Sequence, residues 1–198
     1  VRALACVKQA CAQANKNLGL LSAEQADAVI QACEEVRAGQ WHDQFAVDVI
    51  QGGAGTSTNM NANEVIANRA LEIMGYGRGE YKYLHPLEHV NLSQSTNDVY
   101  PTAVKVALRF LIDDLTAGME VLRLAFAAKA EEFKDILKMG RTQLQDAVPM
   151  TLGQEFSTYA VMLEEDQQRL REGALLIQEM NLGATAIGTG INAHPEYA

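Results

Sequence analysis

The sequence has no stretch of about 18 consecutive apolar residues, which excludes a transmembrane helix. Its first residues also lack the charged start and apolar centre of a secretory signal peptide. The chain begins with Val1 rather than Met and already has a helical pattern, so we expect a trimmed start and a fragment of a longer protein. These features together predict a cytoplasmic protein that does not associate with a membrane.

Cysteine and positive charge are also scarce. The only thiols are Cys6, Cys11 and Cys33, and no CxxC pair occurs. An odd number of cysteines without metal-ligand spacing indicates reduced thiols in a cytosolic protein, buried as small hydrophobes. With 16 basic against 25 acidic residues the formal net charge is −9, which argues against a non-specific interaction with nucleic acid or an anionic membrane.

Sequence signatures of cofactor and metal sites are missing as well. The glycine-rich residues 52–61 contain no P-loop lysine and no Rossmann GxGxxG spacing. The four histidines are not spaced as metal ligands. We therefore expect no cofactor and no metal site. His89 lies close to a polar cluster, but a local hydrogen-bonding role fits it best.

Helical periodicity is what the sequence does contain. Apolar residues recur at helical spacing over residues 1–17 and over 61–74. Between these two segments, a third helix is predicted to start at a capping box at Ser22 and to stop at Gly39. Two proline-free patterns, at about 102–135 and 150–180, each predict a helix roughly 45 Å long. Such helices depend on partner helices, so the pattern predicts a mainly α protein containing an elongated bundle. The segments predicted to be irregular are 51–59, 75–100 and 181–191, while Phe45, Val47 and Val49 fit either a short strand or an extended entry.

Three polar clusters interrupt these patterns, at residues 52–61, 94–98 and 140–146. Hydroxyl and amide groups are poor core material because each needs a hydrogen-bond partner when buried. They are suited to a small, doubly anionic substrate. The middle cluster precedes a long helix, whose N-terminus attracts carboxylates. Neutral donors at that place can also stabilise an oxyanion.

Each cluster has a structural interpretation too. Residues 52–61 can be a helix-capping loop, and Asp98 can cap the helix that follows it. Arg141 can form an ion pair instead of holding a carboxylate. Gln143 and Gln145 can donate to substrate or only support other residues. Local physics leaves these alternatives open.

Together the clusters resemble the signature motifs of the aspartase/fumarase superfamily. The match covers essentially the whole chain, and its motifs are long and specific. They are GTSTNMNANE at 55–64, QSTND at 94–98, GRTQLQD at 140–146, LGQE at 152–155 and GATAIGTG at 183–190. The resemblance implies a small N-terminal helical domain, residues 1–98, followed by the long helices of a central bundle, residues 99–198. It also implies a homotetramer whose active sites collect clusters from different subunits.

Within the superfamily, the details resemble the aspartase branch. Class II fumarases usually read QSSND where this chain has Thr96, GRTHTQD where it has Gln143, and GGTAVGTG where it has Ala184. Their HPNDHVN pattern is HPLEHVN here, at residues 85–91. Some aspartases have histidine at the position of Gln143, and others have glutamine. The glutamine in this chain argues against a mechanism based on that histidine but is compatible with the activity.

The reaction implied is the reversible elimination of ammonia from L-aspartate to give fumarate, through an aci-carboxylate intermediate. In this family the general base is a serine in a GSSxMPxKxN loop, which we expect beyond Ala198. We therefore expect no catalytic residue in this chain and no activity from residues 1–198 alone. The resemblance implies that the substrate is bound by Thr56, Ser95, Thr96, Asn97, Thr142 and Gln143.

Other functions remain open at this stage. The enzyme alternatives are a class II fumarate hydratase and a superfamily lyase acting on another substituted succinate. A non-catalytic helical scaffold is a third, although a scaffold has no reason to place these polar groups at helix ends. Some aspartases respond to divalent cations, but the sequence shows no ligand cluster for one.

Overall fold

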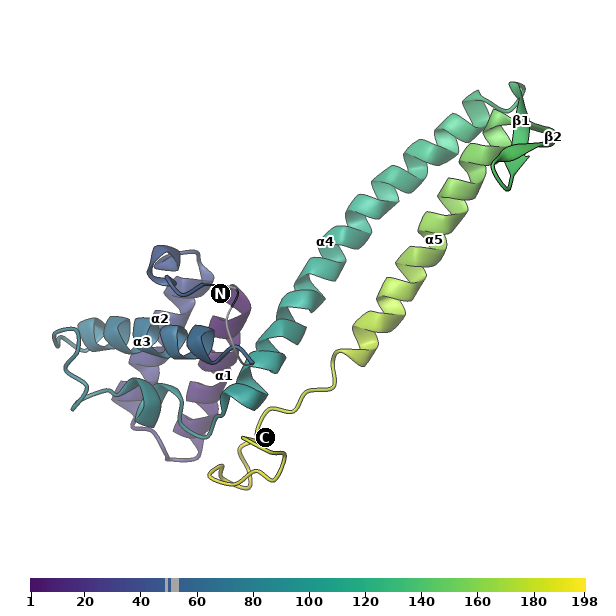
Figure 1. Ribbon diagram of the computed structural model, residues 1–198. Helices are drawn as coiled ribbons and strands as arrows, with labels where there is room; N and C mark the ends of the chain where they lie inside the picture. The colour runs from purple at the N-terminus through teal and green to yellow at the C-terminus, as the bar shows by residue number, and fades with distance from the viewer. Residues whose placement is uncertain (49, 51–53) are drawn as a thin grey trace. The chain divides into compact units, whose positions relative to one another are not determined.

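The computed structural model describes residues 1–48, 50 and 54–198 (Figure 1). The protein is mainly α-helical, as predicted. Val49, Gly52 and Gly53 lie outside the described residues. The elements in order are α1 (Arg2–Asn17), α2 (Ala23–Arg37), the 3-10 helix η1 (His42–Gln44), α3 (Thr56–Ile73), the π-helix η2 (Pro86–Val90), α4 (Thr96–Glu132), β1 (Leu137–Thr142), β2 (Gln145–Thr151) and α5 (Leu152–Leu176).

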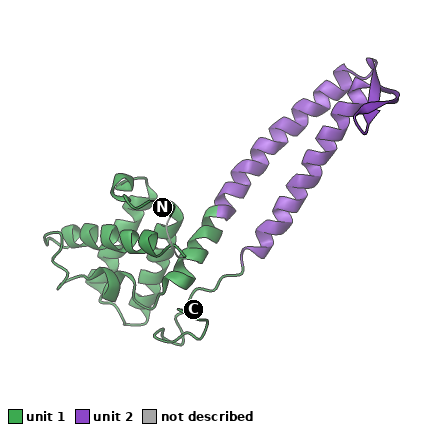
Figure 2. Cartoon of the chain, viewed as in Figure 1, with its two compact units in different colours: residues 1–107, 179–198 green, residues 108–178 purple. Residues whose placement is uncertain are grey.

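The chain forms two compact units (Figure 2). Unit 1 contains residues 1–107 and 179–198, and unit 2 contains residues 108–178. Helix α4 begins in unit 1 and continues into unit 2. Unit 1 is therefore assembled from two stretches of chain that are separated by the whole of unit 2. The predicted domain boundary between residues 98 and 99 stays a prediction.

The core of unit 1 is built from small side chains. Helix α1 packs on α2, and α2 packs on α3. Ala32 and Cys33 of α2 and Ala67 and Ala70 of α3 are fully buried, so the helices approach closely. The ends of α2 follow the predicted signals. Its first turn is capped by the Ser22 hydroxyl, and Gly39 follows its end with a positive φ.

A second apolar cluster fixes the beginning of α4. Leu4, Val7 and Cys11 of α1 pack against Val99 and Ala103 of α4. All five side chains are buried. Because this contact involves the first two turns of α4, it determines where the residues just before those turns lie. Those residues belong to the polar cluster at 94–98.

Helix α3 begins earlier than its sequence pattern indicated. It starts at Thr56, so residues 56–59 are helical rather than part of the predicted loop. The preceding residue, Gly55, has φ +86°, and a Cβ atom at that position would lie 2.4 Å from the ring of Tyr100. Only glycine permits both this conformation and this approach. Gly55 thus brings the start of α3 against the first turns of α4.

Helix α4 also begins earlier, at Thr96 rather than about residue 102, and Pro101 lies inside it. Proline has no N–H to donate to the carbonyl four residues before it, which is that of Asn97. That carbonyl instead accepts a 3.1 Å hydrogen bond from Asn181 Nδ2. A side chain 84 residues away therefore replaces the missing helical bond. The predicted helix began only after the proline, because no residue close in the sequence supplies this donor.

Unit 2 contains the rest of α4, a β-hairpin and α5. Strands β1 and β2 pair antiparallel, with an irregularity between Met139 and Arg141. The turn is formed by Gln143 and Leu144, both with positive φ. Aromatic rings join the two helices at the hairpin end, where Phe126 lies 5.9 Å from Phe156 between ring centroids. The hairpin was not predicted, because two-residue turns of this kind usually contain Asn-Gly or Asp-Gly.

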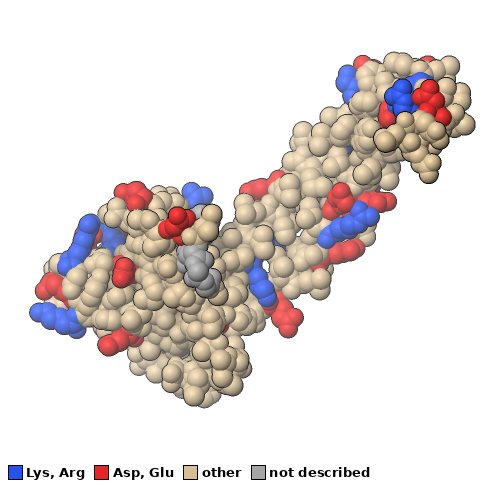
Figure 3. Space-filling model, viewed as in Figure 1, with Lys and Arg blue, Asp and Glu red and all other residues tan. Residues whose placement is uncertain are grey.

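None of the helices described is long and apolar enough to cross a membrane. The long helices instead carry charged residues throughout. On the face shown in Figure 3, basic and acidic side chains are interspersed rather than segregated by sign. Several ion pairs within unit 2, such as Arg123–Glu120 at 2.7 Å, lie between residues three or four apart on one helix.

Two glycines of α5 give a matched test of packing in unit 2. At Gly153 a Cβ atom would lie 2.4 Å from the backbone oxygen of Ala130, whereas at Gly173 no atom lies within 4 Å. We expect Gly153→Ala to lower the free energy of unfolding by about 1–3 kcal/mol through overpacking. Gly173→Ala should raise it by about 0.5–1 kcal/mol because alanine favours the helix. Denaturant unfolding of both variants measures the difference, and equal effects would contradict this packing.

Candidate functional site

The N-terminal turns of α3 and α4 meet in unit 1. Asn59 Nδ2, in the first turn of α3, donates a 3.0 Å hydrogen bond to Thr96 Oγ1, at the start of α4. The structure thus brings two of the three predicted clusters together. Ser95 and Thr96 are half-buried there, while Thr56 and Asn97 are exposed. Two helix N-termini at one place favour a bound anion.

Ser95 caps helix α4. Its hydroxyl accepts a 3.3 Å bond from Asn97 N, and Asp98 Oδ1 accepts a 2.9 Å bond from Ser95 N. The expectation that Asp98 would be the cap was wrong in detail. Asp98 instead occupies the third helical position, where a carboxylate binds back to the N-cap residue. The Ser95 oxygen is therefore part of the helix start as well as of the predicted substrate site.

The second oxygen of Asp98 ties the glycine-rich segment 181–190 to this helix start. Asp98 Oδ2 accepts a 2.9 Å bond from Thr185 N, and both residues are buried. Asn97 Nδ2 donates a 2.9 Å bond to the carbonyl of Ala186. The segment thus completes the surroundings of residues 95–98. Its part in the site could not be located from the sequence, because the bonds link positions almost 90 residues apart.

A buried amide cluster lies behind the site. Asn91 Oδ1 accepts three hydrogen bonds, from Lys8 Nζ at 2.9 Å, Asn59 Nδ2 at 3.2 Å and Asn63 Nδ2 at 3.1 Å. Lys8, Asn59 and Asn63 are at most 1 % exposed. The sequence indicated no role for Lys8, Asn63 or Asn91, and indicated Asn59 only as one of the side-chain donors of the cluster at 52–61. One signal was available, because Lys8 occupies the apolar face of α1 between Leu4 and Cys11.

Lys8 is a buried amine with amide partners. Besides Asn91 it donates a 2.7 Å bond to Gln94 Oε1, next to Ser95. Burial lowers the pKa of Lys8 from 10.5 to about 7, against the opposing influence of Cys11, Cys33 and Asp98. A neutral amine has two N–H groups, which match these two acceptors. Lys8 therefore holds residues 91–94 without requiring a buried carboxylate partner.

A cavity of about 390 Å³ opens beside the start of α4. Its lining includes the amides and hydroxyls of Asn91, Gln94, Ser95 and Thr185, together with the acidic Glu88 and apolar side chains. The volume is ample for a four-carbon dicarboxylate. The hydroxyl of Thr185 is buried without a hydrogen-bond partner among the described residues.

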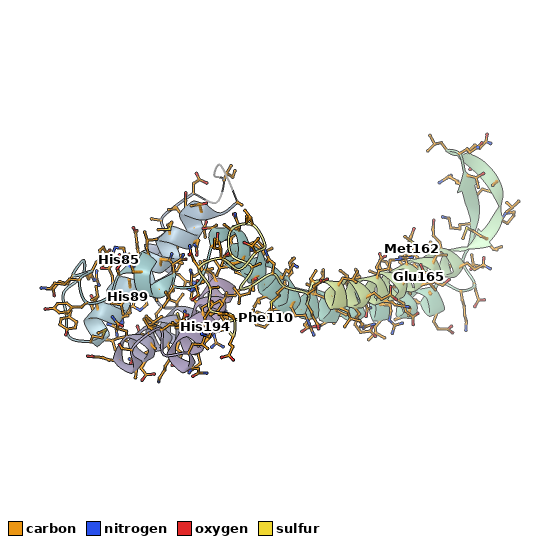
Figure 4. The ribbon with its side chains drawn as sticks, turned by 90° about the horizontal axis from the view of Figure 1, so that it is seen from below. His85, His89, Phe110, Met162, Glu165 and His194 are labelled. Atoms are coloured by element: carbon orange, nitrogen blue, oxygen red, sulfur yellow. The ribbon has the colours of Figure 1, made fainter. Side chains whose placement is uncertain are left out.

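The two histidines nearest the site serve local structure. His85 Nδ1 accepts bonds from the backbone N–H groups of Leu87 and Glu88 and so caps η2. His89 Nδ1 accepts a 2.7 Å bond from His85 N (Figure 4). Burial lowers the pKa of His89, which favours the neutral ring. In the part of the chain that the structure describes, no group of three or more His, Cys, Asp or Glu side chains is placed to hold a metal ion.

The third predicted cluster lies in unit 2, apart from the other two in this division of the chain. Thr142 ends strand β1, and Gln143 forms the hairpin turn. Both side chains are exposed. Arg141 Nε lies 3.2 Å from Asp146 Oδ1, as an ion-pair interpretation of Arg141 requires. Thr142 and Gln143 therefore belong to a different unit from Thr56 and residues 95–97.

Comparison with known proteins supplies the family. The sequence model of a family described as Lyase matches residues 1–198. An aspartate ammonia-lyase from Pseudomonas aeruginosa is 62 % identical over 198 residues, which cover 100 % of this chain and 42 % of that protein. The chain thus spans less than half the length of the curated relatives it matches.

Solved structures of the same architecture are also known. The structure of a fumarate lyase:delta crystallin from Brucella melitensis bound to cobalt has a TM-score of 0.95 and 56 % identity, covering 100 % of this chain and 43 % of that chain. A class II fumarase from Schistosoma mansoni has a TM-score of 0.91 at 38 % identity, covering 100 % of this chain and 41 % of that chain.

The pKa of Lys8 predicts how stability depends on pH. Between about pH 7 and 10.5 the unfolded state binds more protons at Lys8 than the folded state, so stability rises with pH. Relative to Lys8→Met, the wild-type free energy of unfolding should increase by about 2 kcal/mol between pH 7 and 9. Lys82→Met, at an exposed side chain, is the control for denaturant unfolding at both pH values. A Lys8→Met difference that stays constant over this range would contradict the assignment.

Proposed function

This chain belongs to the lyase family whose sequence model matches its whole length, and from that premise we propose that the protein is an aspartate ammonia-lyase. The reaction is the reversible elimination of ammonia from L-aspartate to give fumarate. The observation that carries the proposal is the meeting of two helix N-termini at Thr96, lined with neutral hydroxyl and amide groups. The 62 % identity to an aspartate ammonia-lyase supports the choice of substrate.

The reaction requires an anion site that binds the transition state more strongly than it binds the substrate. Removal of a C3 proton converts the adjacent carboxylate into an aci-carboxylate, which carries additional negative charge on its oxygens. Neutral donors and helix dipoles fixed in place stabilise this charge more than they stabilise the substrate. In our proposal Ser95, Thr96 and Asn97 supply such donors at the start of α4, and Thr56 does so at the start of α3.

Fumarate hydratase is the alternative within the same family. A class II fumarase shares the architecture at 38 % identity, well below the identity to the aspartate ammonia-lyase. The positions that differ from the usual fumarase motifs support the ammonia-lyase too. They are Leu87, Thr96 and Ala184. A lyase acting on another substituted succinate is separated from these two only by its substrate.

We further propose that the protein works as a cytoplasmic homotetramer. Large apolar side chains remain exposed along both long helices in unit 2, among them Phe110, Leu111 and Leu115 of α4 and Val161 and Met162 of α5. Contiguous exposed apolar surface of this kind indicates a protein interface. In this arrangement Thr142 and Gln143 of one subunit complete a site begun by Thr56 and residues 95–97 of another. No cofactor takes part in the proposed reaction.

Activity and the role of Thr96 are tested together. The intact protein should form fumarate from L-aspartate, followed by ultraviolet absorbance, and none from L-malate. Thr96→Val should lower kcat/KM by about 100-fold or more, as loss of an oxyanion donor does. Thr116→Val is the control, because the Thr116 hydroxyl donates to a carbonyl of its own helix. Fumarate from L-malate alone would identify a fumarase instead.

Assembly is tested by mass. Sedimentation equilibrium of the intact protein should give a four-chain particle. Leu111→Glu and Leu115→Glu place charges on the exposed apolar surface and should shift the mass toward one or two chains. Asp114→Asn, at a polar position of the same turns, should leave the mass unchanged. A monomeric wild type would refute the shared site, whatever its activity.

A further inference from the structure

The Thr96 hydroxyl can serve a carboxylate only as a hydrogen-bond donor. A threonine hydroxyl has one proton and two acceptor lone pairs, so its direction depends on its neighbours. If the proton pointed to another protein group, a substrate carboxylate would meet an oxygen lone pair. The neighbour of Thr96 is Asn59, whose Nδ2 lies 3.0 Å from Thr96 Oγ1.

Asn59 makes Thr96 an acceptor on its protein side. An amide N–H donates and does not accept, so the Thr96 proton has no role in this contact. Among the described residues no acceptor for the Thr96 hydroxyl proton is found. Asn59, which donates to the Thr96 oxygen, is only 1 % exposed and so lies on the protein side of this hydroxyl. The proton is therefore available to a ligand at the start of α4.

The orientation of the Asn59 amide is itself imposed by other groups. Its second N–H donates to Asn91 Oδ1 at 3.2 Å. Asn91 must present oxygen there, because the same atom receives Lys8 Nζ at 2.9 Å and Asn63 Nδ2 at 3.1 Å. A reversed Asn59 amide would place its oxygen against the oxygens of both Asn91 and Thr96. The direction of every bond in this series is thus fixed from Lys8 to Thr96.

We propose that Asn59 is a positioning residue that presents the Thr96 hydroxyl as a donor to a carboxylate of the substrate, with the direction set by Lys8 through Asn91. The substrate as a dicarboxylate rests on the proposed function. The Asn59 oxygen supports this assignment, since it is buried without a partner among the described residues. Burying an amide oxygen without a partner lowers the free energy of unfolding, so the two N–H groups of Asn59 are what this position uses.

Asn63 provides the matched control. It lies on the same helix, is 0 % exposed, donates to the same oxygen of Asn91 and also has an unpartnered Oδ1. It differs from Asn59 in its hydrogen bonds, because its amide donates to Asn91 and to Met60 Sδ but not to Thr96. In Asn59→Asp and Asn63→Asp a donor to Asn91 is replaced by an acceptor. Only Asn59→Asp also gives the Thr96 hydroxyl an acceptor inside the protein.

The experiment measures succinate binding to the intact protein by calorimetry, with fumarate formation from L-aspartate assayed separately. Asn59→Asp should bind succinate about tenfold or more weakly than Asn63→Asp, as expected for one lost bond to a charged group. In a Thr96→Val background, Asn59→Asp should weaken succinate binding by less than about a further twofold, because the two residues act as a unit. Asn59→Ala and Asn63→Ala repeat the comparison without a buried carboxylate, in case the first pair does not fold.

The outcomes separate the inference from the proposed reaction. Equal affinities in the matched pairs, or additive effects of Asn59→Asp and Thr96→Val, would overturn the positioning role whether or not the protein forms fumarate. If the Asn59 variants bind succinate more weakly than the matched Asn63 variants but no fumarate forms from L-aspartate, the positioning role is supported and the ammonia-lyase is refuted. A wild-type protein that does not bind succinate would overturn both.

Discussion

One amide oxygen, that of Asn91, holds the surroundings of the candidate site together. It receives donors from α1 and α3, while Asn91 itself belongs to the segment that leads into α4. Three donors on one amide oxygen fix the positions of three parts of the chain at a single point. The fixed direction of these bonds then extends outward to the hydroxyl of Thr96. Without that point, small apolar side chains would pack the helices but would not orient any polar group.

This arrangement is not optimal for stability. Lys8 is buried although its charged form is disfavoured there, and two buried amide oxygens lack partners among the described residues. Each unsatisfied group costs about 1–3 kcal/mol. An apolar core would avoid these costs but would supply no oriented donors. The small-residue packing of α1, α2 and α3 supplies the compensating stability.

The sequence predicted the helices well where local signals decide, as at Ser22 and Gly39, and of the three polar clusters it indicated the structure brings 52–61 and 94–98 together. It failed where distant groups decide. The predicted helix began only after Pro101, whereas α4 begins at Thr96, because the donor that permits a proline inside the helix is the distant Asn181. The hairpin was missed because Gln143 and Leu144 are unusual turn residues. Lys8 was visible as a charge on an apolar face, but only its contacts explain it. The roles of the six predicted substrate-binding residues stay predictions.

The bond from Asn181 to the Asn97 carbonyl also constrains the order in which the protein is made. During synthesis the first turn of α4 leaves the ribosome long before Asn181 does, and all of unit 2 is translated in between. Until then the carbonyl opposite Pro101 has only water as a donor, and Asp98 lacks the N–H of Thr185. The turn at the start of α4 is therefore the last part of unit 1 to receive all of its hydrogen-bond donors. If the proposed site is correct, a chain that ends before Asn181 lacks two of the bonds that order residues 97 and 98.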